Sequence, residues 1–189
     1  MKIAITGNIG SGKSEAIKFL SSIGYKCISS DQIIKSLYQN NQSRDYILKS
    51  IGVANKNFKE EIIKRLADPL FDQKLKKVIY PLLYAKKKII APKFEQYVPI
   101  FYEVPLLFEE QLTQDFDATI FISANPTKRK HRVLSRGAST NYFQLMNQKQ
   151  LKENIKLFKS CRVLTENELL TIQNTFKNVS NKVLDPRLW

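Results

Sequence analysis

The chain has 189 residues, enough for one α/β domain with a sizeable core and an inserted subdomain, and too few for two full domains. No apolar run approaches the roughly 20 residues of a membrane span, and the N-terminus begins with a predicted core strand instead of a signal peptide, so we expect a cytoplasmic protein that does not enter a membrane. The formal net charge of +14 raises the question of a nucleic-acid partner. Most of the excess charge, however, is lysine on predicted helix faces, and no nucleic-acid-binding module is recognisable. A solvated surface or a polyanionic small ligand is therefore the simpler interpretation of the charge.

A phosphate-binding loop follows the first predicted strand. The strand Ile3–Thr6 leads directly into G-N-I-G-S-G-K-S at Gly7–Ser14, which matches G-x-x-x-x-G-K-[ST], and a helix is predicted over Lys13–Ser22 with Gly24 as its stop. The glycines let backbone N–H groups curl around phosphate, Lys13 reaches the β- and γ-phosphates, and the Ser14 hydroxyl is placed to ligate Mg²⁺. A glycine-rich turn without a ligand is the alternative. The predicted nucleotide-binding residues are Asn8, Ile9, Gly10, Ser11, Gly12, Lys13 and Ser14.

The second predicted strand, Tyr25–Ile28, ends just before Asp31. In open α/β sheets, ligands collect at the carboxyl ends of the strands, and a carboxylate there could accept a proton from an attacking hydroxyl. The alternative is that Asp31 caps the helix predicted over Gln32–Tyr38, and the two roles can coexist.

Strand and helix signals alternate along the rest of the chain, which predicts an α/β fold of the P-loop nucleoside-triphosphate hydrolase type, with a five-stranded parallel sheet flanked by helices. The remaining predicted strands are Pro99–Glu103, Ala118–Ser123 and Arg162–Leu164, and the last predicted helix is Asn167–Ser180. The pattern divides a single domain, 1–189, into a core of about 1–35, 96–125 and 158–189, a helical insertion of about 36–95, and a mobile basic lid of about 126–157.

The cysteine and histidine content limits the metal chemistry. Cys27 and Cys161 lie in apolar, strand-like segments without C-x-x-C spacing, so we expect buried, reduced thiols and no zinc site. His131 is the only histidine, which leaves acid–base roles to carboxylates or to that one ring.

The segment after the third strand carries the most specific pattern. Pro105 forces an extended turn at the ligand edge within P-L-L-F-E, Pro105–Glu109. Together with the phosphate loop and Ser29-Ser30-Asp31, this segment resembles the dephospho-CoA kinase family, whose members complete coenzyme A synthesis and carry a G-x-x-G-S-G-K-S loop, a D-A-D-like segment and a P-L-L-F-E segment in that order. The resemblance covers essentially the full length, and it implies a single P-loop kinase domain, 1–189, in which the helical insertion of about 36–95 binds the CoA acceptor and the lid carries arginines. It implies ATP as phosphoryl donor, Mg²⁺ as cofactor and dephospho-CoA as acceptor.

The resemblance also implies roles for individual residues. Asp31 would be the base that deprotonates the ribose 3′-hydroxyl of dephospho-CoA, and Lys13 would hold the donor phosphates. Arg132 and Arg136 match the R-x-x-x-R lid segment and would stabilise charge on the transferring phosphoryl group; solvated surface charge is their alternative. Glu103 would help to hold Mg²⁺ through water, unless it is only a solvated carboxylate at the end of a strand.

The chain departs from the family pattern at three places: Ser29 stands for the first Asp of the D-A-D-like segment, Lys35 for an Arg, and Tyr80-Pro81 for a His-Pro pair. Tyr80 keeps a ring and a hydrogen-bonding tip that suit an acceptor contact, although a core aromatic is an equal alternative. Leu106 and Leu107 either line the acceptor pocket or close the core beneath it, and Lys59 is one of several lysines that could meet the acceptor's pyrophosphate. The implied acceptor-binding residues are Asp31, Lys35, Tyr80, Pro105, Leu106, Leu107 and Glu109.

Two other functions remain open at this point. One is a different P-loop small-molecule kinase, such as a nucleoside monophosphate kinase, although Asp31 and the Pro105–Glu109 segment argue against it. The other is a nucleotide-regulated RNA-binding or switch protein, suggested by the net charge. A guanine-specific switch should carry N-K-x-D, and Asn55-Lys56-Asn57-Phe58 lacks the Asp.

Overall fold

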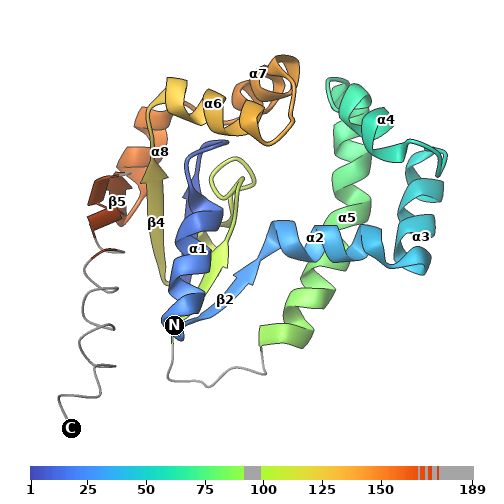
Figure 1. Cartoon of the computed structure of the whole chain (residues 1–189). Helices are drawn as coiled ribbons and strands as arrows, with labels where there is room; N and C mark the ends of the chain where they lie inside the picture. The colour runs from blue at the N-terminus through green and yellow to red at the C-terminus, as the bar shows by residue number, and fades with distance from the viewer. Residues whose placement is uncertain (92–98, 166, 169, 172–173, 175–189) are drawn as a thin grey trace, which may run out of the picture.

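The structure is a computed structural model that describes residues 1–91, 99–165, 167–168, 170–171 and 174. A parallel sheet with the strand order β2-β3-β1-β4-β5 forms its centre (Figure 1). The predicted five-stranded parallel sheet is confirmed, and each strand boundary lies within one residue of the prediction. The strands are β1 (Lys2–Gly7), β2 (Lys26–Ser29), β3 (Ile100–Glu103), β4 (Ala118–Ser123) and β5 (Arg162–Thr165).

The register of the sheet gathers the predicted site motifs at one edge. Glu103 lies opposite both Ile5 of β1 and Ser29 of β2, and Gly7 lies opposite Ile122 of β4. All these pairs are parallel, so the carboxyl ends of the four strands meet at the same edge. The phosphate loop, the segment after β2 and the segment after β3 leave the sheet there, side by side.

Helix α1 (Lys13–Ser22) has the predicted bounds and covers one face of the sheet (Figure 1). It ends where Gly24 adopts φ +95°, a conformation that costs glycine little, and the Gly24 N–H donates to the carbonyl of Ser21. Alternate residues of the strands point to this face, as buried strands require. The buried cluster on this side is Ile3, Ile5, Ala16, Ile17, Phe101 and Ile122.

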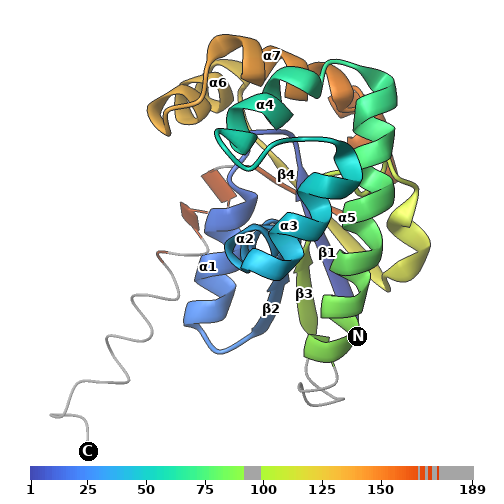
Figure 2. The ribbon, with the colours of Figure 1, turned by 90° about the vertical axis from the view of Figure 1, so that its right-hand side faces the viewer.

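The segment between β2 and β3 is helical, as predicted, throughout its described part. Its helices are α2 (Ser30–Gln39), α3 (Asn41–Ile51), α4 (Phe58–Arg65) and α5 (Pro69–Ile90). In Figure 2, α5 lies on the side of the sheet away from α1, and Ile33 of α2 and Leu83 of α5 pack against strand residues. The far ends of these helices form a hydrophobic core of their own, so the insertion is a subdomain attached to the sheet. That core contains Leu37, Ile47, Leu48, Ile51, Val53, Phe71, Leu75 and Ile79.

The segment predicted as a basic lid consists of three helices, α6 (Pro126–Ser135), α7 (Thr140–Lys149) and α8 (Glu153–Lys159). Asn125 and Ser139 cap the first two, since each side chain accepts a hydrogen bond from a backbone N–H of the first turn. The helices lie over the phosphate-loop end of the sheet (Figure 1). The lid is therefore built from regular helices in this structure.

Some expectations need correction or fall outside the described residues. The prediction of buried thiols is wrong for Cys161, which is exposed just ahead of β5, while Cys27 is half-buried; both thiols are free. The predicted helix Asn167–Ser180 lies largely outside the described residues, and those of its residues that are described are helical. Within the described part of the chain, no helix combines the length and apolar character that crossing a membrane requires.

Candidate active site

The phosphate loop folds around its own lysine. Gly10 and Gly12 adopt φ values of +76° and +105°, in the region where a side chain would be strained. A Cβ atom at Gly10 would also collide with the backbone carbonyl oxygen of Arg129. The Lys13 ammonium donates to the carbonyl oxygens of Gly7, at 2.8 Å, and Asn8, at 3.1 Å. Backbone contacts thus hold the lysine inside the loop where phosphates are expected.

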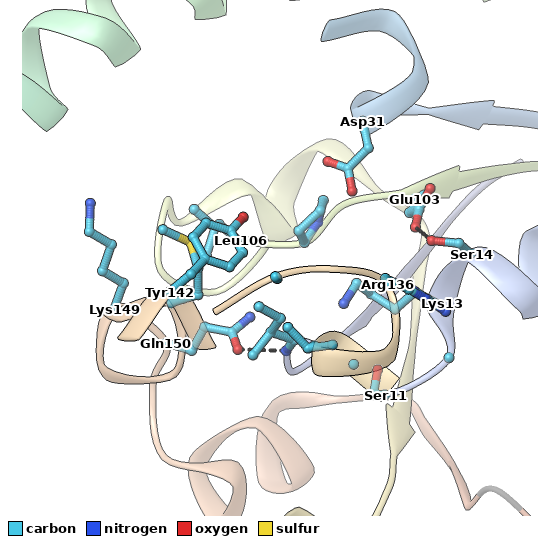
Figure 3. Close-up of a pocket in the computed structure, with 17 residues that line it drawn as sticks. Ser11, Lys13, Ser14, Asp31, Glu103, Leu106, Arg136, Tyr142, Lys149 and Gln150 are labelled. Carbon is cyan, nitrogen blue, oxygen red and sulfur yellow. Dashed lines mark hydrogen bonds between the residues drawn. The ribbon is translucent and has the colours of Figure 1, made fainter. Parts of the chain in front are cut away.

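A cavity of about 460 Å³ opens over this loop, a size suited to a nucleotide-sized ligand (Figure 3). Four separate segments line it: the phosphate loop with α1, the start of α2, the segment after β3, and the α6–α7 region. The sequence-predicted residues on this wall are Ile9, Gly10, Ser11, Gly12, Lys13, Ser14, Asp31, Glu103, Pro105, Leu106 and Arg136. The structure therefore brings most of the predicted donor-site residues together.

Asp31 stands in the first turn of α2, and its carboxylate points toward the cavity (Figure 3). It does not cap the helix: the cap is Ser29, whose hydroxyl oxygen accepts a hydrogen bond from the Gln32 N–H. The Asp31 residue is exposed at the cavity, but the protein around its carboxylate displaces part of its hydration. This desolvation raises the pKa of Asp31, the negative charge of Glu103 raises it further, and the positive charge of Lys13 opposes both. A carboxylate with a raised pKa is a stronger proton acceptor, which suits a general base.

Glu103 is only 2 % exposed, so it is not the solvated strand-end carboxylate considered as an alternative. The Ser14 hydroxyl donates to one of its oxygens at 2.7 Å, and the Ser29 hydroxyl donates to the other. Ser29 therefore places a hydroxyl donor where an Asp would bring a second negative charge against Glu103. This substitution lets the carboxylate stay buried with both oxygens hydrogen-bonded.

The oxygens of Ser14, Glu103 and Asp31 are of the type that Mg²⁺ prefers. Among the described residues, no group of three or more His, Cys, Asp and Glu side chains could hold a metal ion by itself. Mg²⁺ commonly takes only one or two carboxylates from the protein and completes its shell with water and substrate phosphates. The oxygen donors present fit that coordination, since Ser14 and Glu103 already meet at 2.7 Å.

Burial lowers the pKa of Lys13 from 10.5 to about 8, an effect that the nearby charges of Asp31 and Glu103 only partly offset. The lysine remains mostly protonated at neutral pH. Burial of its positive charge costs free energy, and phosphate oxygens would stabilise that charge.

The lid arginines divide into three positions. Arg136 lines the cavity, as expected for a residue that contacts the nucleotide. Arg132 lies outside that cavity. Its guanidinium donates to the carbonyl of Gly10 at 3.3 Å, so it contacts the backbone of the phosphate loop. Arg129 was not predicted: it is buried, and it donates to the carbonyl of Ile9 at 3.3 Å and to the Asn147 side chain at 3.0 Å. Its spacing of four residues from buried Val133 marks the inward face of α6 and could have revealed it.

The Pro105–Glu109 segment points in two directions. Pro105 and Leu106 line the cavity, whereas Leu107 is fully buried in the core beneath it, so Leu107 does not lie in the acceptor pocket. Glu109 also faces away: its carboxylate lies 2.5 Å from the ammonium of Lys156, which is completely buried, and accepts the Leu151 N–H at 2.9 Å. Both predictions of direct substrate contact are corrected, because packing and an ion pair occupy these side chains.

The acceptor residues of the insertion lie at two separate places. Tyr80 lines a second cavity of about 140 Å³ that shares Asp31, Pro105 and Leu106 with the first. Lys35 and Lys59 line a third, of about 460 Å³, within the insertion. Lys35 follows Asp31 by four residues on α2 but lines a different cavity, so the structure does not bring these two predicted acceptor residues to the same place.

A group of residues from the end of the lid also escaped prediction. The Gln150 side-chain oxygen accepts the Ile9 N–H at 2.8 Å (Figure 3). Lys156 donates to the Asn8 side-chain oxygen at 2.8 Å, and the Asn8 amide donates to Glu153 at 3.3 Å. These contacts fix the phosphate loop to α8 and its preceding turn. They join residues more than 140 positions apart, so no local sequence signal reveals them.

Comparison with known proteins gives a consistent result. The family model described as dephospho-CoA kinase matches residues 1–171. The dephospho-CoA kinase of Rickettsia typhi is 32% identical over 163 residues, 85% of each chain, and that of Fusobacterium nucleatum is 27% identical over 186 residues, 95% of each chain. A crystal structure of a Thermus thermophilus protein is 26% identical, with a TM-score of 0.75 over 96% of this chain and 97% of that chain. A dephospho-CoA kinase from Campylobacter jejuni, 20% identical with a TM-score of 0.56 over 96% of each chain, shares the fold.

Proposed function

The chain belongs to the dephospho-CoA kinase family, the ATP-dependent enzymes that complete coenzyme A synthesis, and on this premise we propose how its residues divide the reaction. Asp31 is the general base, the phosphate loop holds ATP in the larger cavity, and the acceptor approaches from the smaller one. One observation carries the proposal: the Asp31 carboxylate lines both cavities. A hydroxyl at that point can meet both a proton acceptor and the γ-phosphoryl group.

The proposed transfer breaks the bond between the γ-phosphorus and the oxygen that bridges it to the β-phosphate. A new bond forms between that phosphorus and the acceptor's 3′-oxygen, and the hydroxyl proton passes to Asp31. The raised pKa of Asp31, caused by desolvation and by Glu103, favours this proton transfer. The products are CoA and ADP.

Lys13 and Arg136 provide the positive charge at the donor end of the cavity. In our proposal the Lys13 ammonium exchanges its bonds to the carbonyls of Gly7 and Asn8 for bonds to the β- and γ-phosphates. Arg136 then neutralises charge on the transferring group, where a charge-assisted hydrogen bond is strongest. Arg132 and Arg129 act indirectly, because they contact the loop carbonyls of Gly10 and Ile9.

Mg²⁺ belongs to this proposal as well. Ser14 and Glu103 would hold it, and when bound it offsets the negative charge of the phosphates. The hydroxyl of Ser29 keeps the Glu103 carboxylate in place for that purpose. Replacing Glu103 with Gln should therefore raise the Mg²⁺ concentration needed for half-maximal activity more than it raises the KM for dephospho-CoA.

An acceptor comparison tests the assignment. ADP release is measured with MgATP and either dephospho-CoA or nucleoside monophosphates, and CoA is detected by mass spectrometry. We expect only dephospho-CoA to stimulate turnover and to yield CoA with the new phosphate on the 3′-oxygen. Turnover with a nucleoside monophosphate, and none with dephospho-CoA, would refute the substrate assignment while leaving the fold intact.

A further inference from the structure

The smaller cavity beside Asp31 has walls that suit a flat aromatic ring. It is lined by the apolar side chains of Ile34, Leu83 and Leu106 and by the rings of Tyr80 and Tyr84, whose centroids lie 6.4 Å apart at 78°. Its volume is about 140 Å³. An apolar protein cavity of roughly 150 Å³ is known to hold one benzene molecule, so this cavity fits a ring system better than a whole nucleotide.

The acceptor carries such a ring close to its reactive hydroxyl. In dephospho-CoA, the 3′-hydroxyl and the adenine base are attached to the same ribose, two ring bonds apart. If Asp31 receives the proton of that hydroxyl, the base must lie within a few ångströms of Asp31. The larger cavity is already assigned to ATP, so the smaller cavity is the space that remains beside the carboxylate.

Three charged residues, Asp31, Lys87 and Glu110, also line this cavity. Glu110 lines the cavity close to Tyr80, whose pKa its negative charge helps to raise after burial, and its carboxylate lies 2.7 Å from the Lys76 ammonium. Lys76 is held in turn by Asp72 at 3.2 Å. Lys76 therefore fixes the position of Glu110 and balances its charge, which leaves carboxylate lone pairs available to a ligand.

We propose that this cavity binds the adenine ring of the acceptor and that Glu110, positioned by Lys76 and lying beside Tyr80, recognises its exocyclic amine. This inference rests on the proposed function and adds a basis for acceptor selection. The amine is a hydrogen-bond donor and the carboxylate only accepts, whereas hypoxanthine and guanine present a carbonyl oxygen at the same ring position. The aromatic ring of Tyr80 supplies stacking area, so Tyr80 contributes in two separable ways.

The experiment compares dephospho-CoA with its deaminated analogue, in which hypoxanthine replaces adenine. For the wild type, kcat/KM should be about 10- to 100-fold higher with the adenine acceptor, the value expected for one hydrogen bond to a charged group. Glu110→Gln should bring the two acceptors within a few-fold of each other, because an amide can either accept from the amine or donate to the carbonyl. Tyr80→Phe should lower the discrimination partway, and Tyr80→Ala should raise the KM for both acceptors about 5- to 100-fold through lost stacking.

The controls separate this role from a structural one. The KM for ATP should stay within twofold of the wild type in all three variants, and Tyr46→Phe, on exposed α3 surface away from both cavities, should match the wild type throughout. Calorimetric binding of the two acceptors supplies a readout that needs no turnover. Adenine preference in binding that Glu110→Gln abolishes would support this inference even if no CoA were formed, in which case the proposed function alone would fall.

Two results would overturn the inference. One is CoA formation with a base preference that survives both Glu110→Gln and Tyr80→Phe. The other is a raised KM for ATP in Tyr80→Ala with an unchanged KM for dephospho-CoA, since the cavity would then hold the base of the donor.

Discussion

Replacing Lys13 with Met should stabilise the ligand-free protein while abolishing catalysis. Burial lowers the pKa of Lys13 from 10.5 to about 8, and at 1.36 kcal/mol per pKa unit this shift corresponds to a cost of about 3 kcal/mol for keeping the charge inside. Methionine removes the charge but leaves the carbonyls of Gly7 and Asn8 without their lysine donor, a loss of about 1 kcal/mol each. The net gain is about 1 kcal/mol, or a rise in Tm of about 2 to 4 °C for a chain of this size.

The gain should depend on pH in a defined direction. Below pH 8, folded Lys13 carries its charge and the cost is fully present. Between about pH 8 and 10.5, Lys13 is neutral in the folded state and still charged in the unfolded state, so the stability of the wild type rises with pH. The advantage of Lys13→Met should therefore be greatest below pH 8 and shrink across that window.

Urea unfolding of the ligand-free protein at pH 7 and pH 10 measures both effects. Lys18→Met on the same helix is the matched control, because the Lys18 side chain is 71% exposed and its ion pair with Glu15 is long, at 3.9 Å. That control should change the free energy of unfolding by less than about 0.5 kcal/mol. A Lys13→Met protein that is less stable than the wild type at pH 7, or whose difference does not vary with pH, would show that the buried charge of Lys13 does not destabilise the ligand-free protein.

Three further predictions concern the loop, its support and the base. Gly10→Ala should lower the free energy of unfolding by about 2 kcal/mol or more and weaken ATP binding, because φ is +76° and the new Cβ would meet the Arg129 carbonyl; a Kd for ATP equal to that of the wild type would contradict this. Lys156→Met should lower the free energy of unfolding in urea by about 3 to 5 kcal/mol, because it leaves the Glu109 carboxylate buried without a counter-charge. Adding Glu109→Gln should recover most of that lost stability. A double variant as unstable as the single one would show that the ion pair is not the cause. In a pH profile at saturating MgATP, kcat/KM for dephospho-CoA should fall tenfold per pH unit on the acid side. The fall should pass through a pKa above the ordinary Asp value of 3.8, because desolvation and the charge of Glu103 raise the pKa of Asp31. An acid limb at or below 3.8 would contradict the assignment of Asp31 as the general base.

The parts of this protein that sequence predicts well are those with local causes. The spacing of Gly7, Gly10 and Gly12 before a lysine fixes the phosphate loop, and short apolar runs fix the strands to within one residue. The order of motifs then places Asp31 and Glu103 at the same sheet edge, since parallel strands share a carboxyl edge.

The parts that sequence missed depend on contacts between distant segments. Leu107 and Glu109 sit in a segment whose direction is set by the core and by Lys156, a residue 47 positions from Glu109. Gln150 reaches Ile9 across 141 positions. A residue type such as Gln or Lys has no fixed role in a polar lid segment, so only the folded arrangement distinguishes a surface lysine from one that is fully buried beneath the phosphate loop.

The proposed mechanism depends above all on Asp31 taking the proton from the acceptor hydroxyl. The most direct test is the single-turnover rate of CoA formation at saturating MgATP and dephospho-CoA, measured for the wild type and for Asp31→Asn, with the Kd of ATP determined for both. If Asp31 is the base, the transfer rate of the variant should be lower by about 10²- to 10⁴-fold, while its Kd for ATP stays within a few-fold of the wild type. A transfer rate close to that of the wild type would contradict it.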